Sequence, residues 1–208
     1  MLRAKASRSL LAAAMVFTPV AAAHAQAPAQ TNAGGLGGPV VPGICMLSRE
    51  AVFAHAKVSV YASERIRQLT AEAQSEVDAD RKPIDAEMAA LRAQASKLTP
   101  DQIRAQQAAL GQKLAPVQVK AEQRRKEIEK TRIDAVATIS AQLQPMIAAV
   151  YAQKGCGLLF DRGTLLGGNF ANDLTGAVVA ALDARLTQIP IQRAVVPPAA
   201  AGAPSTPK

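Results

Sequence analysis

Hydrophobic positions between residues 60 and 154 recur at helical spacing in two long stretches. In the first, apolar or small residues are separated by mostly three, four or seven positions: Ile66, Leu69, Ala73, Val77, Ile84, Met88, Leu91, Ala95 and Leu98. In the second, the apolar positions are Ile103, Leu110, Leu114, Val117, Ala121, Ile128, Val136, Ile139, Leu143, Ile147 and Val150. This spacing predicts two long helices, each with an apolar seam that packs along a partner.

The boundary between the two helices is marked by the segment Thr99-Pro100-Asp101-Gln102. Thr99 suits an N-cap, Pro100 the first helical position, and Gln102 completes a capping-box pattern. Because almost no linker separates the helices, they must run antiparallel, as a hairpin over residues 60–154. The first helix alone would span about 60 Å at the usual rise per residue, so the hairpin is expected to project as an arm.

Short apolar runs with strand character flank the arm. Residues 43–47 (GICML) and 156–160 (CGLLF) each predict a strand, and residues 164–166 can return antiparallel after a turn. Residues 173–175 can cap a last helix with four inward residues, Val178, Val179, Leu182 and Leu186. The predicted fold is mainly α, with the hairpin inserted between strands of a small antiparallel sheet. Residues 41–59 and 155–189 form this β-rich body.

The two ends of the chain have a different character. Residues 1–25 combine Arg3, Lys5 and Arg8 with an apolar run and an Ala23-His24-Ala25 cleavage pattern, which predicts a removed secretory signal. No other membrane-spanning candidate is expected. Residues 26–40, rich in Gly, Pro, Ala and Gln, predict a flexible linker, and the Pro/Ala-rich residues 190–208 predict a disordered tail.

Composition argues against several function classes. The net charge is +8, and removal of the signal leaves 21 basic against 16 acidic residues, or +5, too weak to indicate nucleic acid. His55 is then the only histidine, so a histidine-based metal site or catalytic triad would rest on one residue. No phosphate-binding glycine loop is present. We therefore expect no enzyme, no metal and no cofactor.

Charge is distributed unevenly along the predicted arm. Residues 88–126, around the turn, hold only Asp101 and Glu122 as acids. They hold eight basic residues: Arg92, Lys97, Arg104, Lys113, Lys120, Arg124, Arg125 and Lys126. A positive arm end could attract acidic chains or anionic lipid. The alternative is an ordinary solvated coiled-coil surface.

The apolar seam of the arm is thin, since many of its positions are Ala or Gln. Such an arm buries modest area and opens easily, which suits weak, many-point contact with non-native chains. The apolar residues assigned to this contact are Met88, Leu91, Leu98, Ile103 and Leu110. A passive structural spacer would share these features.

Two pairs of residues can shape the arm. Pro83 and Pro116 each lie about sixteen residues from the turn and would face each other, so a hinge is one reading and two independent prolines the other. Cys45 and Cys156 flank the arm and can pair as a disulfide in an oxidising compartment. Two buried free thiols remain the alternative.

The order of strand, short helix, basic helical hairpin and closing segment resembles the Skp/OmpH family of periplasmic chaperones. The matching segments are GICMLSREAVFAHAKV, YAQKGCGLLFDRG and NDLT…VVAAL, and the resemblance covers about residues 40–189. It implies a trimer in which three body sheets join and three helical arms enclose a cavity for unfolded outer-membrane proteins, held without ATP. Ile44, Met46, Leu158 and Phe160 would then help form the trimer body, and the basic residues would meet acidic clients or lipopolysaccharide.

Oligomerisation is expected on physical grounds as well, because a body of a few short strands is too small to be stable alone. Two other functions compete with the chaperone reading. An adaptor of an envelope export system also carries a helical hairpin between β-segments, but with longer β-domains. A passive envelope scaffold would bind no unfolded client.

Overall fold

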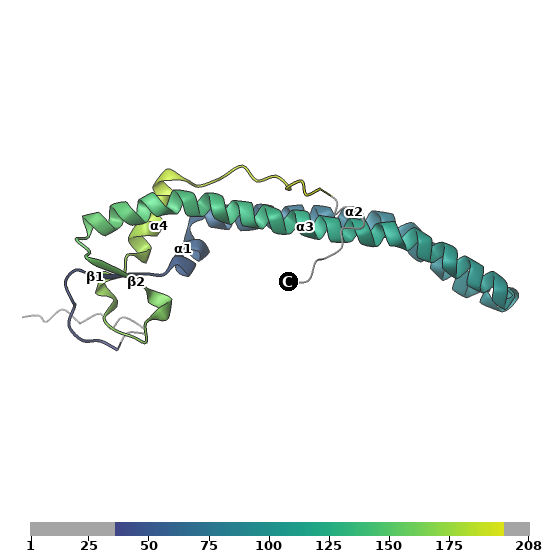
Figure 1. Ribbon diagram of the computed structural model, residues 1–208, viewed down its shortest axis with the longest axis horizontal. Coiled ribbons are helices and arrows are strands. Elements are labelled where there is room, and N and C mark those ends of the chain that lie inside the picture. Colours follow the sequence, from purple (N-terminus) through teal and green to yellow (C-terminus); the bar gives the residue numbers. More distant parts are fainter. Residues whose placement is uncertain (1–35, 198–208) are drawn as a thin grey trace, which may run out of the picture.

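The computed structural model describes residues 36–197, in which a small body lies at one end of a long helical arm (Figure 1). The signal, most of the linker and the last part of the tail lie outside the described residues. The elements, in chain order, are β1 (Ile44–Leu47), α1 (Arg49–His55), α2 (Lys57–Gln94), η1 (Ala95–Lys97), α3 (Pro100–Gln153), β2 (Leu158–Asp161), η2 (Arg162–Thr164), η3 (Phe170–Asn172) and α4 (Thr175–Arg185).

The arm is the antiparallel pair α2 and α3, as the apolar spacing predicts. Toward the body its seam continues into the main core, which includes Ile66, Leu69 and Ile139. Toward the tip a second buried cluster contains Val77, Ile84, Leu110 and Val117. One predicted seam position is wrong: Val136 is 47% exposed, and its neighbour Ala135 is buried instead.

The turn at the tip has the predicted capping box. The Thr99 hydroxyl accepts a hydrogen bond from the Gln102 backbone N–H at 3.3 Å, and the Gln102 side chain accepts from the Thr99 N–H at 2.9 Å. Two backbone donors at the start of α3 are thus satisfied reciprocally, which fixes where the helix begins.

The sheet is parallel, so the predicted antiparallel sheet is wrong. β1 pairs with β2 in parallel, with Ile44 opposite Leu158 and Met46 opposite Phe160, and the whole arm serves as the crossover that a parallel pair requires. The predicted returning strand is absent from the described chain. The Asp161 carboxylate accepts from the Gly163 N–H at 2.8 Å and its carbonyl accepts from the Thr164 hydroxyl at 2.9 Å, so these local bonds favour the tight turn η2 over a strand.

The core of the body forms where α1, α3 and α4 meet. Val52, Leu143, Val178 and Leu182 are fully buried there. Beside this core, a disulfide joins Cys45 to Cys156, with Cα atoms 5.8 Å apart. The bond closes a loop that contains the entire arm, and so it ties the start of α2 and the end of α3 to the same body.

The prolines do not interrupt the helices. Pro83 lies within α2, and Pro116 lies within α3, which also contains Pro145. Ion pairs of Lys113 with Glu87 and of Lys120 with Asp80 set the register between the helices, and they place Pro83 and Pro116 at the same level. A hinge at this level stays a prediction.

Among the described residues, α3 is the one helix whose length and composition would allow it to cross a membrane. Its most apolar stretch has a mean hydropathy of 1.3. The sequence analysis had expected no such candidate. Leu143, Ile147 and Val150 of this helix are buried in the core. These three residues pack against α2 and the body, but only 28% of the apolar window is buried, and Ile133 and Val136 of the same helix are exposed.

The chain after α4 turns back and lies along the arm, as the yellow segment beside α2 and α3 in Figure 1 shows. We call residues 189–197 the strap. Ile189 and Ile191 of the strap are buried in the main core. Disorder was predicted from residue 190, but the structure describes this segment as packed on the arm through its first residues.

Candidate functional site

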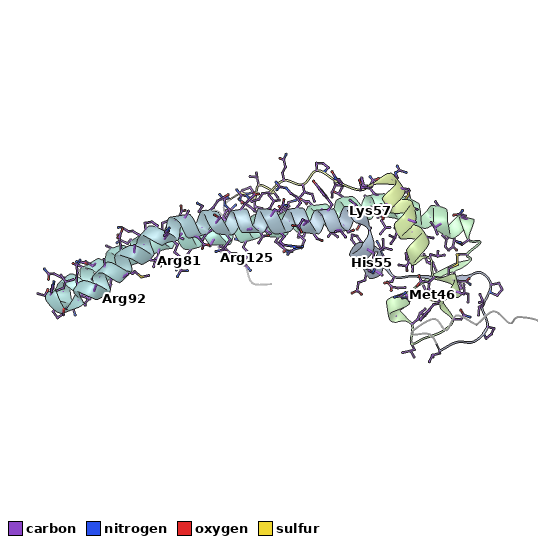
Figure 2. All side chains as sticks on the ribbon, turned by 180° about the vertical axis from the view of Figure 1, so that it is seen from behind. Met46, His55, Lys57, Arg81, Arg92 and Arg125 are labelled. Carbon is purple, nitrogen blue, oxygen red and sulfur yellow. A yellow bond between two sulfur atoms is a disulfide. The ribbon has the colours of Figure 1, made fainter. Side chains whose placement is uncertain are left out.

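The predicted basic residues do not all lie at the arm end. Figure 2 shows Arg92 near the tip, whereas Arg125 lies at mid-arm beside Arg81. Lys120 and Arg124 pair with Asp80 and Glu76, which lie 14 and 18 residues before the end of α2 at Gln94 (94 − 80 and 94 − 76). The basic arm end therefore consists of Arg92, Lys97 and Arg104, and the other predicted residues line the middle of the arm.

Three of the basic residues of α3 are paired across the seam with acids of α2. Lys113 Nζ lies 2.7 Å from Glu87 Oε1, Lys120 Nζ lies 2.7 Å from Asp80 Oδ2, and Arg124 Nε lies 2.6 Å from Glu76 Oε2. The residue numbers in each pair add to 200, as expected for antiparallel helices joined near residue 100. The uneven charge is thus partly explained by pairing between the two helices.

Most of the remaining basic residues are also paired locally. Arg104 pairs with Asp101, and Arg125 pairs with Glu122 at 2.9 Å, with Lys126 at 3.8 Å from the same carboxylate. In the described part of the chain, Arg92 and Lys97 have no ion-pair partner. Lys82 of α2 likewise has no ion pair among the described residues, so Arg92 and Lys97 are the uncompensated positive charges at the tip itself.

The predicted apolar contact residues belong to the seam of the hairpin. Leu110 belongs to the second buried cluster, the one toward the tip, and Met88 and Leu91 pack against that cluster. Leu98 and Ile103 are half-buried at the tip. These side chains hold α2 and α3 together, and four of them (Met88, Leu91, Ile103 and Leu110) also line an open hollow of about 340 Å³ near the tip.

A hollow that the seam pattern does not predict lies on one side of the arm, close to the body. This basal groove has a volume of about 790 Å³ and is lined by apolar and small residues that include Phe53, Ala62, Ile66, Val136 and Ile139. It continues toward the tip as a second hollow of about 610 Å³ that shares Thr70, Gln74 and Arg132 with the first.

Small side chains create the basal groove. Ser59, Ala62, Ser63 and Ala71 recur on one face of α2, where larger residues would fill the space against α3. The buried Ser59 hydroxyl lines the groove and has no hydrogen-bond partner within the described residues. This run of small residues at helical spacing was the signal in the sequence that could have predicted the groove.

β2 is exposed at its free edge and on both of its faces. Leu158, Leu159 and Phe160 are 55%, 36% and 41% exposed, and among the described residues no strand pairs with the free edge of β2. The predicted body residues divide accordingly: Leu158 and Phe160 are available for contact, Ile44 is half-buried, and Met46 is buried in the body. The strand thus presents an uncovered apolar edge.

Four charged side chains form a cluster between the arm and the strap. Arg193 Nη1 lies 2.8 Å from Glu76 Oε1, and Arg193 Nε lies 3.4 Å from Glu127 Oε2. Arg124 also contacts both carboxylates, at 2.6 Å and 2.8 Å. Hydrogen bonds from Arg193 and then Arg124 hold the pKa of Glu76 below its usual range, although desolvation opposes them.

Other groups also have pKa values displaced by local partners, and hydrogen bonds to Glu127 and Glu76 raise the pKa of Arg124. The hydrogen bond between Arg125 and Glu122 lowers the pKa of Glu122 and raises that of Arg125. In the body, burial acts to raise the pKa of Asp173, but hydrogen bonds from Thr175 and Arg162 outweigh it and the pKa is lowered. These shifts arise from salt bridges and caps, which is the pattern of a structural surface.

Low pH should weaken the attachment of the strap. A carboxylate whose pKa is depressed by folding stabilises the folded state above its unfolded pKa, and this stabilisation is lost as the pH falls through the folded value. We expect Glu76→Gln to reduce the free energy of unfolding at about pH 6, and the difference from wild type to shrink toward about pH 3. Urea unfolding at both pH values measures this, and a difference that stays constant would contradict the role of the Glu76 charge.

No group of three or more His, Cys, Asp or Glu side chains that could hold a metal is found among residues 36–197. The site that the structure presents is therefore a set of surfaces: the basal groove, the exposed edge of β2, the two free charges of the tip and the strap cluster. These surfaces can bind chains, and their side chains do not converge on a point as a reaction centre would.

The fold and these surfaces define a protein with a long helical arm on a small disulfide-linked body. The family model described as "Outer membrane protein (OmpH-like)" matches residues 43–182. This chain belongs to the OmpH-like family, a family of chaperones, which confirms the resemblance seen in the sequence.

A solved structure supports the assignment. It is the crystal structure of an OmpH-like protein from Caulobacter crescentus CB15, proposed to be an outer membrane chaperone. The two chains are 31% identical and superpose with a TM-score of 0.68, over 77% of this chain and 95% of the other. No curated protein sequence matched the chain.

Proposed function

We propose that this protein is an ATP-independent periplasmic holdase that binds unfolded outer-membrane proteins and prevents their aggregation during transport. The observation that carries the proposal is the open, mostly apolar basal groove on a long arm of an OmpH-like fold. An open groove whose exposed lining is mostly apolar, with polar side chains such as Arg67 and Gln74 among it, suits transient contact with many non-native chains, whereas a single ligand favours a closed pocket.

We propose a homotrimer as the working form. The apolar edge of β2 is exposed at the side of the body, and a sheet of only two short strands leaves that edge without a partner. A second copy that covers Leu158, Leu159 and Phe160 would remove this apolar surface from water. Three arms held by one body would then surround a client from several sides.

The tip charges are proposed to meet acidic stretches of a client, or the phosphates of lipopolysaccharide or anionic lipid. Arg92 and Lys97 have no partner carboxylate in the described residues, so contact with an anion breaks no internal ion pair. The contribution is expected to be modest and to fall with salt, because both side chains lie at an exposed end.

Reversing the tip charges should weaken client binding. The protein contains no tryptophan, so the fluorescence of a tryptophan-containing outer-membrane β-barrel protein, diluted from urea, reports binding without background. We expect Arg92→Glu with Lys97→Glu to weaken the apparent affinity by roughly five-fold at low salt, with a smaller loss at high salt.

Arg81→Glu with Lys82→Glu is the matched control, since it changes the charge equally at exposed residues of α2 that line neither the basal groove nor its continuation. Equal affinities for wild type and the tip variant would eliminate the role of the tip. The absence of binding by the wild-type chain would overturn the proposed function itself and favour an adaptor or a scaffold.

A further inference from the structure

The strap lies beyond the part of the chain that the family model matches, which ends at residue 182. It runs in the groove between α2 and α3 on the side opposite the basal groove, since Arg65 and Glu76 lie across the seam from Thr70 and Gln74. The strap thus shows how this arm binds an extended polypeptide segment.

Most hydrogen bonds between the arm and the strap are made to backbone groups of the strap. Arg65 Nε donates to the Ile191 carbonyl at 3.5 Å, and the Ala194 N–H donates to the Thr131 hydroxyl at 2.8 Å. The Gln123 side chain donates to the carbonyl of Val196. Because these bonds are made to backbone groups, another extended chain could make them with a different sequence.

One strap side chain is recognised by charge. The guanidinium of Arg193 lies between the carboxylates of Glu76 and Glu127, and Glu127 is only 6% exposed. With Arg193 in place, two carboxylates face two guanidiniums, because Arg124 contacts the same pair. Without Arg193, the carboxylate of Glu76 and the buried carboxylate of Glu127 would share the single guanidinium of Arg124. This position of the groove therefore requires a positive side chain.

The outer part of the strap is held weakly enough to be replaced. Only Ile189 and Ile191 of the strap are fully buried, and they lie at its body end. Arg193 is partly exposed, and Val195 is 88% exposed. A partly exposed charge cluster and a few backbone bonds give the outer strap a local opening free energy below that of global unfolding.

We propose that the strap groove, formed by Arg65, Glu76, Gln123, Glu127 and Thr131, is a binding site for extended polypeptide segments that carry an arginine or lysine next to aliphatic residues. The strap is the resident occupant of this site, and an incoming segment displaces it. This inference rests on the proposed function for the source of such segments, and it adds the chemistry that this surface selects.

The test uses the full chain and a fluorescein-labelled peptide with the sequence of residues 190–196, PIQRAVV. Arg193→Glu places a carboxylate against Glu76 and Glu127, which should release the strap. If the strap fills the groove most of the time, fluorescence anisotropy should show the peptide binding to Arg193→Glu about ten-fold more tightly than to wild type. A peptide with glutamate in place of its arginine should bind at least about ten-fold more weakly.

Two further variants distinguish release of the strap from general effects. Arg81→Glu carries the same charge change at an exposed position of α2 outside the strap groove and the basal groove, and it should bind the peptide no better than wild type. Glu127→Gln added to Arg193→Glu should weaken peptide binding, because it removes a partner of the peptide arginine. Circular dichroism checks that each variant keeps its helices.

Equal peptide binding by wild type and a folded Arg193→Glu variant, or equal binding of the arginine and glutamate peptides, would overturn the inference. If wild type also protects an unfolded client from aggregation in that case, the proposed function stands without the strap site. Peptide binding without any client protection would support the strap site and refute the holdase function.

Discussion

Replacing Cys45 and Cys156 together by alanine should lower the free energy of unfolding by about 2–4 kcal/mol in oxidising buffer. The disulfide joins residues separated by 111 positions, and the loop that it closes contains both arm helices. Without this link, the unfolded chain gains the conformational freedom of that long loop, which favours unfolding. Denaturant unfolding followed by helical circular dichroism measures the change.

Reduction of the wild-type protein provides the internal control. Reduced wild type should unfold near the midpoint of the double alanine variant, and the variant itself should not respond to the reductant. Coincident unfolding of the variant and oxidised wild type would show that the disulfide contributes nothing to stability. The effect should appear in the body and the base of the arm, since the bond lies beside the buried residues Leu47 and Val150.

Phe160→Asp should convert the assembled protein to monomers and abolish most client binding. Phe160 is 41% exposed on β2, whose outer edge has no partner strand among residues 36–197. In the proposed trimer this side chain is buried between copies, and a carboxylate there would be desolvated without a partner. Size-exclusion chromatography with light scattering measures the mass directly.

Val119→Asp is the matched control for this experiment. Val119 is 69% exposed on α3, on the arm and away from β2, so the same kind of change should leave the assembly intact. If wild type elutes as a monomer, or if Phe160→Asp assembles like wild type, then β2 does not form the proposed interface.

The helical arm could be predicted in detail from the sequence, because the apolar periodicity and the capping residues indicate the same two helices and the same turn between them. The capping residues Thr99 and Gln102 fix the turn, and from the turn the register of the two helices follows. The pairing of Lys113, Lys120 and Arg124 with acids of α2 could have been predicted from that register as well. We instead assigned these basic residues to an arm end.

The sheet could not be predicted equally well. Strands of four residues carry too little pattern to fix their direction, and here the turn after Asp161 is set by side-chain hydrogen bonds that compete with a returning strand. The strap was missed because Pro and Ala dominate its surroundings and indicate disorder. Its alternation of Ile189, Ile191 and Arg193 was the available sign of an ordered extended segment.

The most direct test of the holdase function is suppression of aggregation by the purified protein without nucleotide. An outer-membrane β-barrel protein is diluted from urea, and light scattering is followed at rising concentrations of this chain. We expect suppression that saturates near about three chains per client, as a trimer around one client requires. Undiminished scattering at a large excess of the chain would contradict the account.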